Sequence, residues 1–311
     1  MQSMSLETSE GVALGARLYP SGAERKGAVL IGGAMGVRQE YYAPFAAWLA
    51  TQGFDVMTFD YRGMGESRGA GGARSLRGFE ADLDSWARDY DTAIDALAER
   101  AADAPLYLIG HSLGAQLPGM LRNRHRIAGL LSVAAGSGYW RDNAPPLRRS
   151  ILYFWFALVP VATRLFGYFP GKRLRKVGDL PRGVILQWRR WCLDPRYHVG
   201  AEGERLRSQF EQVRFPVVAL SMTDDELMTE RGTRVLVDCY PNAPRRIERI
   251  APADVSAKRI GHFGFFRDQF QSSLWARSVA LLQGFEPSPP GRLKATTPPW
   301  GAGAEGVVGA T

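Results

Sequence analysis

The stretch Gly110-His111-Ser112-Leu113-Gly114 decides how this sequence folds. It follows the apolar run 105–109, which has the pattern of a buried strand, and it precedes residues 113–122, which we expect to form a helix. A serine on a tight turn between a strand and a helix projects its hydroxyl at the end of a sheet, and the flanking glycines permit the sharp bend. Ser112 is therefore the candidate nucleophile.

A serine hydroxyl becomes reactive only when a base takes its proton and a carboxylate orients that base. The sequence has four histidines, at positions 111, 125, 198 and 262. The first lies within the turn itself, the second lies in a charged segment, and the third lies in a polar segment. His262 lies in a glycine-flanked loop between a strand-like stretch and an amphipathic run, so it is the candidate base.

The candidate acid lies in Asp224-Asp225-Glu226, directly after the buried-strand pattern of residues 217–221. We favour Asp225, because an apolar residue two positions later, here Leu227, commonly follows the acid in this arrangement. Asp224 is the alternative, since it stands three residues after a small residue at the strand end. A purely structural interpretation is that both carboxylates cap the helix expected from residue 228.

The order Ser, Asp, His along the chain is that of the α/β-hydrolases. The chain resembles this superfamily across residues 5–285, and its segment Asp60-Tyr61-Arg62-Gly63-Met64-Gly65-Glu66-Ser67 is similar to one that follows the fourth strand of the family. It is most similar to bacterial predicted hydrolases related to the serine-aminopeptidase-like and monoglyceride-lipase-like groups. The resemblance implies an α/β fold with a mostly parallel central sheet, helices on both faces and an inserted helical lid.

An acyl-transfer serine also requires N–H groups that stabilise the oxyanion. The resemblance implies that the backbone of Leu113 supplies one of them. The second would come from the loop after residues 28–31, with Ala34 preferred and Met35 as the next register. Many relatives begin this loop with His-Gly, whereas this chain has Gly32-Gly33. The difference leaves the amide chemistry intact, because the donor belongs to the main chain.

The rest of the sequence predicts strands that alternate with helices. We expect a hairpin over residues 4–19 and strands at 28–31, 55–60, 105–109, 127–134, 217–221 and 246–250. Helices are expected at residues 44–52, 79–100, 113–122, 228–240 and 266–285. The predicted domains are a hydrolase core of residues 1–136 and 208–285, a helical lid of residues 137–207, and a disordered tail of residues 286–311.

The predicted lid carries the excess positive charge of the chain. Twelve basic and three acidic residues give residues 137–200 a net charge of +9, and the whole chain has +8. Basic and aromatic residues in one segment suit peripheral contact with an anionic membrane or an acidic substrate, although a solvated lid surface explains them equally well. The apolar run 151–162 is too short to span a bilayer, and no nucleic-acid-binding motif accompanies the charge.

These features predict a serine hydrolase of the carboxylesterase or lipase type, acting on a small-molecule ester. An aromatic lid suits a hydrophobic acyl chain, and the mechanism needs no metal or organic cofactor. An acyltransferase or an amide or peptide-bond hydrolase could use the same residues, and a binding protein could share the fold. The absence of a signal-like N-terminus and the presence of only two cysteines predict a cytoplasmic location.

Overall fold

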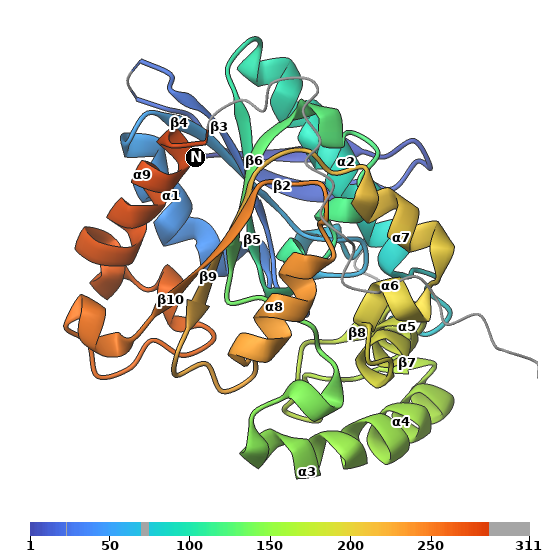
Figure 1. The fold of residues 1–311 in the computed structure, drawn as a ribbon. Coiled ribbons are helices and arrows are strands. Elements are labelled where there is room, and N and C mark those ends of the chain that lie inside the picture. The colour runs from blue at the N-terminus through green and yellow to red at the C-terminus, as the bar shows by residue number, and fades with distance from the viewer. Residues whose placement is uncertain (23, 70–74, 286–311) are drawn as a thin grey trace, which may run out of the picture.

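An eight-stranded sheet forms the centre of this computed structural model, which describes residues 1–22, 24–69 and 75–285 (Figure 1). The strand order is β1-β2-β4-β3-β5-β6-β9-β10. Its members are β1 (Gln2–Glu7), β2 (Ala13–Tyr19), β3 (Gly27–Gly32), β4 (Phe54–Phe59), β5 (Leu106–His111), β6 (Ile127–Val133), β9 (Val217–Met222) and β10 (Arg245–Ile250). Pairs that include β2 are antiparallel, and all pairs from β4 to β10 are parallel. The predicted mostly parallel sheet is confirmed.

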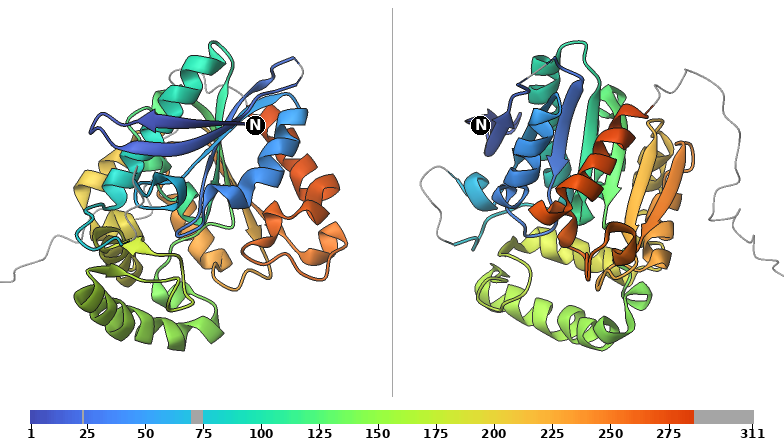
Figure 2. Two further views of the ribbon diagram at one scale, coloured as in Figure 1. Left: turned by 180° about the vertical axis from the view of Figure 1, so that it is seen from behind. Right: turned by 90° about the vertical axis from the view of Figure 1, so that its left-hand side faces the viewer.

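Helices cover both faces of this sheet (Figures 1 and 2). Helices α1 (Ala43–Thr51) and α9 (Ala276–Gln283) pack on one face, while α2 (Leu83–Ala101) and α8 (Glu230–Asp238) pack on the other. Strands β3, β4, β5 and β9 are buried along their whole length. A parallel strand between two helical layers has no solvent side, which explains why these segments read as unbroken apolar runs.

The helix expected at residues 113–122 is wrong. This segment forms two short 3-10 turns, Ser112–Ala115 and Pro118–Met120. Pro118 lacks the N–H that a continuous α-helix would use at that position. Gly119 lies against the ring of Phe210, and a Cβ there would be 2.5 Å from ring carbons. The nucleophile therefore precedes a loose turn region rather than a long helix.

The segment Asp60 to Ser67 has a structural role. The buried carboxylate of Asp60 accepts hydrogen bonds from the backbone N–H groups of Gln39 and Glu66, at 2.8 and 2.9 Å. Gly65 lies so close that a Cβ would be 2.0 Å from Asp60 Oδ2. This arrangement joins the loop after β4 to the loop after β3, which lies at the candidate site.

Between β6 and β9 the chain forms a separate group of helices, the insertion, which corresponds to the predicted lid of residues 137–207. Its elements are α3 (Pro145–Tyr153), α4 (Val159–Phe166), β7 (Tyr168–Phe169), β8 (Leu180–Pro181), α5 (Arg182–Leu193) and α6 (Tyr197–Ala201), and α7 (Glu204–Glu211) leads back to the sheet. The insertion lies at the end of the sheet to which strands β9 and β10 point (Figures 1 and 2). No helix in the described ranges is long and apolar enough to cross a membrane. The predicted tail of residues 286–311 lies outside the described residues.

His198, on α6 of the insertion, is unusual because this histidine is buried in the protein core. Its side chain is fully buried and its ring stacks on Phe210 at 4.4 Å between centroids. Neither ring nitrogen has a hydrogen-bond partner within the described residues. Burial lowers the pKa of His198 to about 3, so the imidazole is neutral in the folded protein.

We expect this histidine to destabilise the protein in mild acid. The unfolded chain binds a proton at His198 near its ordinary pKa of about 6.5, whereas the folded chain does not until about pH 3. Stability from this residue is therefore lost as pH falls through that window, by roughly 2 kcal/mol at pH 5. His198→Phe should raise the free energy of unfolding at pH 5 more than at pH 8, measured by urea denaturation. An equal effect at both pH values would contradict this assignment.

Candidate active site

Ser112 lies at the end of β5 with a backbone conformation that residues other than glycine rarely adopt. Its φ angle is +51°, and the residue is 8% exposed. The two flanking glycines are required by close approach rather than by their own φ angles. A Cβ at Gly114 would be 2.0 Å from the carbonyl oxygen of Gly32, and one at Gly110 would be 2.5 Å from the backbone nitrogen of Ala115. The strain is thus held at the serine itself, as in a nucleophile elbow.

His262 and Asp225 form a buried pair. The imidazole Nδ1 lies 2.9 Å from Asp225 Oδ2 and 3.2 Å from Oδ1, and both side chains are at most 2% exposed. Asp225 is held by its own loop, because Oδ1 accepts from the backbone N–H groups of Leu227 and Met228, each at 2.8 Å. The carboxylate can therefore fix the imidazole with Nδ1 protonated, leaving Nε2 as the basic atom.

The neighbouring carboxylates hold the histidine loop. Asp224, the alternative acid, accepts from the backbone N–H groups of Ile260 and Gly261, at 2.9 and 3.1 Å, and the structure shows no bond to the imidazole among the described residues. Glu226 accepts from the backbone N–H of His262 at 3.1 Å. Burial raises the pKa of Glu226, but these backbone hydrogen bonds and a nearby arginine outweigh it, so the pKa is lowered overall. All three consecutive acids therefore serve one loop.

A hydrogen-bond chain joins the loop after β3, the serine turn and the histidine loop. The N–H of Ala34 donates to Tyr42 Oη at 2.8 Å, and Tyr42 Oη lies 2.9 Å from His111 Nδ1. His111 Nε2 lies 3.0 Å from the carbonyl oxygen of His262. Burial lowers the pKa of His111 well below its usual range, so the ring is neutral. One tautomer satisfies the whole chain: Tyr42 donates to Nδ1, and Nε2–H donates to the carbonyl.

His111 is the site residue that sequence reasoning missed. Its position inside the turn excluded it as the base, and no pattern in the sequence indicated that Tyr42 and the carbonyl of His262 would meet its ring. The rings of His111 and His262 lie 5.2 Å apart, so the residue before the nucleophile packs against the candidate base. The structure records no hydrogen bond between the Ser112 hydroxyl and His262 in the described ranges. Such bonds often tighten only when a substrate binds.

The hydrogen bond from Ala34 changes the expectation for the oxyanion hole. Its N–H already donates to Tyr42, so in this conformation Ala34 does not present a free donor. Met35, the next register, has no backbone partner for its N–H among the described residues, and neither does Leu113. The physical reason is that a single N–H donates one hydrogen bond, and here Tyr42 Oη accepts it.

We expect Tyr42 to stabilise this arrangement measurably. Tyr42→Phe leaves His111 Nδ1 and the Ala34 N–H buried without partners, which should lower the free energy of unfolding by about 2 kcal/mol. Tyr90→Phe is the matched control, because that hydroxyl is also buried but already lacks a partner. Urea denaturation compares the two variants. Equal losses would show that the hydrogen-bond chain contributes nothing.

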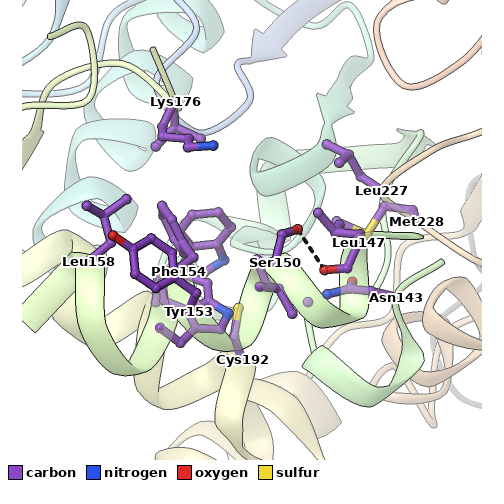
Figure 3. A pocket seen from close by; sticks show the side chains of 15 residues that line it. Asn143, Leu147, Ser150, Tyr153, Phe154, Leu158, Lys176, Cys192, Leu227 and Met228 are labelled. Carbon is purple, nitrogen blue, oxygen red and sulfur yellow. Dashed lines mark hydrogen bonds between the residues drawn. The ribbon is translucent and has the colours of Figure 1, made fainter. Parts of the chain in front are cut away.

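A cavity of about 270 Å³ lies between the insertion and the acid loop (Figure 3). Its lining residues are Gly138, Asn143, Leu147, Ser150, Ile151, Tyr153, Phe154, Trp155, Leu158, Lys176, Val177, Trp188, Cys192, Leu227 and Met228. Leu227 and Met228 are the residues whose amides hold Asp225, so the cavity adjoins the candidate site, although Ser112 and His262 are not part of its wall. Most of this wall is apolar, and Lys176 is its charged member.

The sheet and its helical layers form the α/β-hydrolase fold. The family model of serine aminopeptidases, S33, matches residues 23–174, which include the loop after β3 and Ser112 but neither Asp225 nor His262. The chain has the α/β-hydrolase fold and is similar to serine-aminopeptidase-like and monoglyceride-lipase-like hydrolases. No protein of curated function matches the sequence.

Solved structures with the same fold include several hydrolases. Monoglyceride lipase from Saccharomyces cerevisiae, solved as a soluble variant with a substrate analogue, has a TM-score of 0.65 and 15% identity, covering 90% of this chain and 94% of that one. A thermostable carboxyl esterase from Bacillus coagulans, solved with glycerol, has a TM-score of 0.60 and 14% identity, covering 91% and 98%. The N-formylmaleamic acid deformylase of Pseudomonas putida has a TM-score of 0.51 and 15% identity, covering 89% and 100%. At these identities the likeness establishes the fold.

Proposed function

We propose that this protein is a serine hydrolase that cleaves carboxylic esters with an apolar acyl group. The observation that carries the proposal is the 2.9 Å contact between His262 and Asp225, with the His262 ring 5.2 Å from the ring of His111. His111 directly precedes Ser112, which stands in a strained turn at the end of β5. The hydrolases among the structural neighbours support the same class of reaction, by analogy of fold.

In the proposed reaction, His262 Nε2 takes the proton of Ser112 as Oγ attacks the ester carbonyl carbon. Asp225 stabilises the imidazolium, and the N–H groups of Leu113 and Met35 bind the oxyanion. The C–O bond to the alcohol then breaks, and His262 returns the proton to the leaving alcohol. A water molecule, deprotonated by the same imidazole, attacks the acyl-enzyme and releases the carboxylic acid, which restores the serine.

We assign the apolar cavity to the acyl chain of the substrate. Burying a hydrocarbon chain there would contribute about 25 cal/mol for each Å² removed from water. The helices of the insertion supply most of the wall, so in this proposal residues 137–207 act as the lid over the active site. A peptide would bring polar backbone groups against the same wall without partners for them, which favours an ester with a hydrocarbon chain.

A cavity-filling variant tests this assignment. Ile151→Trp, in the cavity wall, should lower kcat/KM for p-nitrophenyl octanoate at least tenfold and leave p-nitrophenyl acetate nearly unchanged, because only the long chain needs the space. Leu165→Trp, on the exposed side of α4, is the control and should change neither rate. If Ile151→Trp changes both esters equally, the cavity does not hold the acyl chain. Product analysis with added glycerol separates hydrolysis from transfer to an alcohol.

A further inference from the structure

The helix that forms the outer edge of the insertion exposes large apolar side chains to solvent. Helices α3 and α4 are joined by the π-turn Phe154–Leu158 into one continuous helix from residue 145 to 166. Six large apolar side chains are exposed in the described part of the protein, and four of them lie on this helix. They are Tyr153, Phe156, Val161 and Leu165, each between 56% and 64% exposed.

These four side chains share one face of the helix. Their spacings are three, five and four residues, and the step of five crosses the π-turn, which adds one residue to a turn. The opposite face is buried against the rest of the insertion through Trp155 and Val159. Figures 1 and 2 show this helix as the element furthest from the sheet at that end of the molecule, so no other described element covers its outer face.

Positive charges lie on and beside the same helix. Arg148 and Arg164 are exposed on the helix itself. The guanidinium of Arg189 lies 5.4 Å from the ring centre of Phe156, and that of Arg173 lies 5.6 Å from the ring centre of Phe166. None of these four arginines forms an ion pair with a carboxylate of the described residues. The acidic residues of this region, Asp142, Asp179 and Asp194, are instead engaged elsewhere.

We propose that this outer face docks on the surface of an anionic phospholipid bilayer. We define the docking face as Arg148, Tyr153, Phe156, Val161, Arg164 and Leu165. Apolar side chains of this kind enter the boundary between headgroups and acyl chains, while arginines beside them meet the lipid phosphates. The positive charge argues against a second copy of the chain as the occupant, because a symmetric contact would place like charges against each other.

Docking would place the candidate site next to the bilayer, where esters with apolar acyl chains dissolve. The same helix lines the cavity through Leu147, Ile151 and Phe154, and Tyr153 belongs both to the docking face and to the cavity wall. A protein held by the docking face therefore presents this wall of the cavity towards the lipid surface. The inference goes beyond the proposed hydrolysis, and vesicle binding is measured without any turnover, so either one can fail while the other stands.

Vesicle flotation of the full-length protein tests the proposal. The vesicles contain phosphatidylcholine alone or with roughly 30% phosphatidylglycerol, at about 0.05 M and about 0.5 M salt. One variant combines Phe156→Gln with Leu165→Gln, and a second combines Arg148→Gln with Arg164→Gln. The matched control combines Lys26→Gln with Arg100→Gln, which removes the same charge from exposed positions outside the insertion. None of the six residues substituted in these three variants lines the cavity or belongs to the proposed triad.

We expect binding to the anionic vesicles at low salt, weakened by high salt and absent with phosphatidylcholine alone. The arginine pair should weaken binding about thirtyfold, which is about fivefold for each charge. The apolar pair should weaken binding at least tenfold. The control should bind like the natural protein, and all variants should hydrolyse a soluble acetate ester equally. Absence of vesicle binding, equal losses in the control, or a dimer in gel filtration that the apolar pair dissociates would overturn the proposal.

Discussion

Replacing Ser112 with alanine should lower kcat/KM for p-nitrophenyl esters by roughly 10⁴- to 10⁶-fold, because removal of the nucleophile leaves only binding and oxyanion stabilisation. The melting temperature should change little, since Oγ makes no hydrogen bond that the described part of the structure records. Initial rates with p-nitrophenyl acetate and octanoate measure the effect, and the burst of p-nitrophenol should disappear with it.

Ser132→Ala is the matched control for this variant. Ser132 lies on β6 directly beside Gly110 of β5, and its buried hydroxyl has no partner among the described residues. Both changes remove one buried oxygen near the same strand end. If Ser132→Ala reduces activity as much as Ser112→Ala, the losses reflect damage to the fold, and Ser112 has no special role.

Replacing Asp225 with asparagine should reduce kcat about 10⁴-fold. The amide oxygen can still accept the N–H groups of Leu227 and Met228, so the loop should keep its shape. The amide nitrogen, however, would face Nδ1 of His262 with a donor. The imidazole would then carry its proton on Nε2 and could not accept the proton of Ser112.

Asp224→Asn provides the comparison, because it also replaces one carboxylate oxygen by an amide nitrogen, at the adjacent residue. Among the described residues, that side chain accepts hydrogen bonds only from the backbone of Ile260 and Gly261. We therefore expect a loss of less than about a hundredfold, through looser positioning of the loop. The kcat values of both variants, measured on one ester, decide between the two acids. A larger loss for Asp224→Asn would mean that the acid is misassigned.

Much of the fold was readable from the sequence because the central strands are buried on both sides. The unbroken apolar runs that become β3, β5 and β9 are short and are bounded by turn residues, which favours strands over buried helices. The helix after the serine was not readable in this way. Its sequence is apolar enough for a helix, but Pro118 and the contact of Gly119 with Phe210 end it, and that contact depends on a residue far along the chain.

The candidate site also has residues that local sequence patterns predict and contacts that only the folded structure reveals. Ser112 and His262 were identified from local glycine patterns, and the choice of Asp225 rested on an apolar residue two positions later. The structure brings Asp225 to His262 and gives Asp224 to the backbone of the loop. The N–H of Ala34, the oxyanion donor that we expected from the sequence, donates to Tyr42, eight residues later. A hydrogen bond to a side chain is set by tertiary packing, which no local pattern records.

The insertion was predicted because it interrupts the alternation of strands and helices, and because its aromatic and basic residues fit no strand. The net charge of the insertion was counted from the sequence, but the sequence did not show which residues of 145–166 face solvent and which face the cavity. The π-turn shifts the apolar period by one residue, so the exposed face at Phe156 and Val161 does not follow a regular helical spacing.

The central claim is that Ser112, His262 and Asp225 act as one catalytic unit, and the most direct measurement is peptide mapping after reaction with a fluorophosphonate. We predict a single adduct on Ser112, formed quickly in the natural protein and far more slowly in the Asp225→Asn variant. An adduct on another serine, or labelling of Ser112 at the same rate without the carboxylate, would contradict the account.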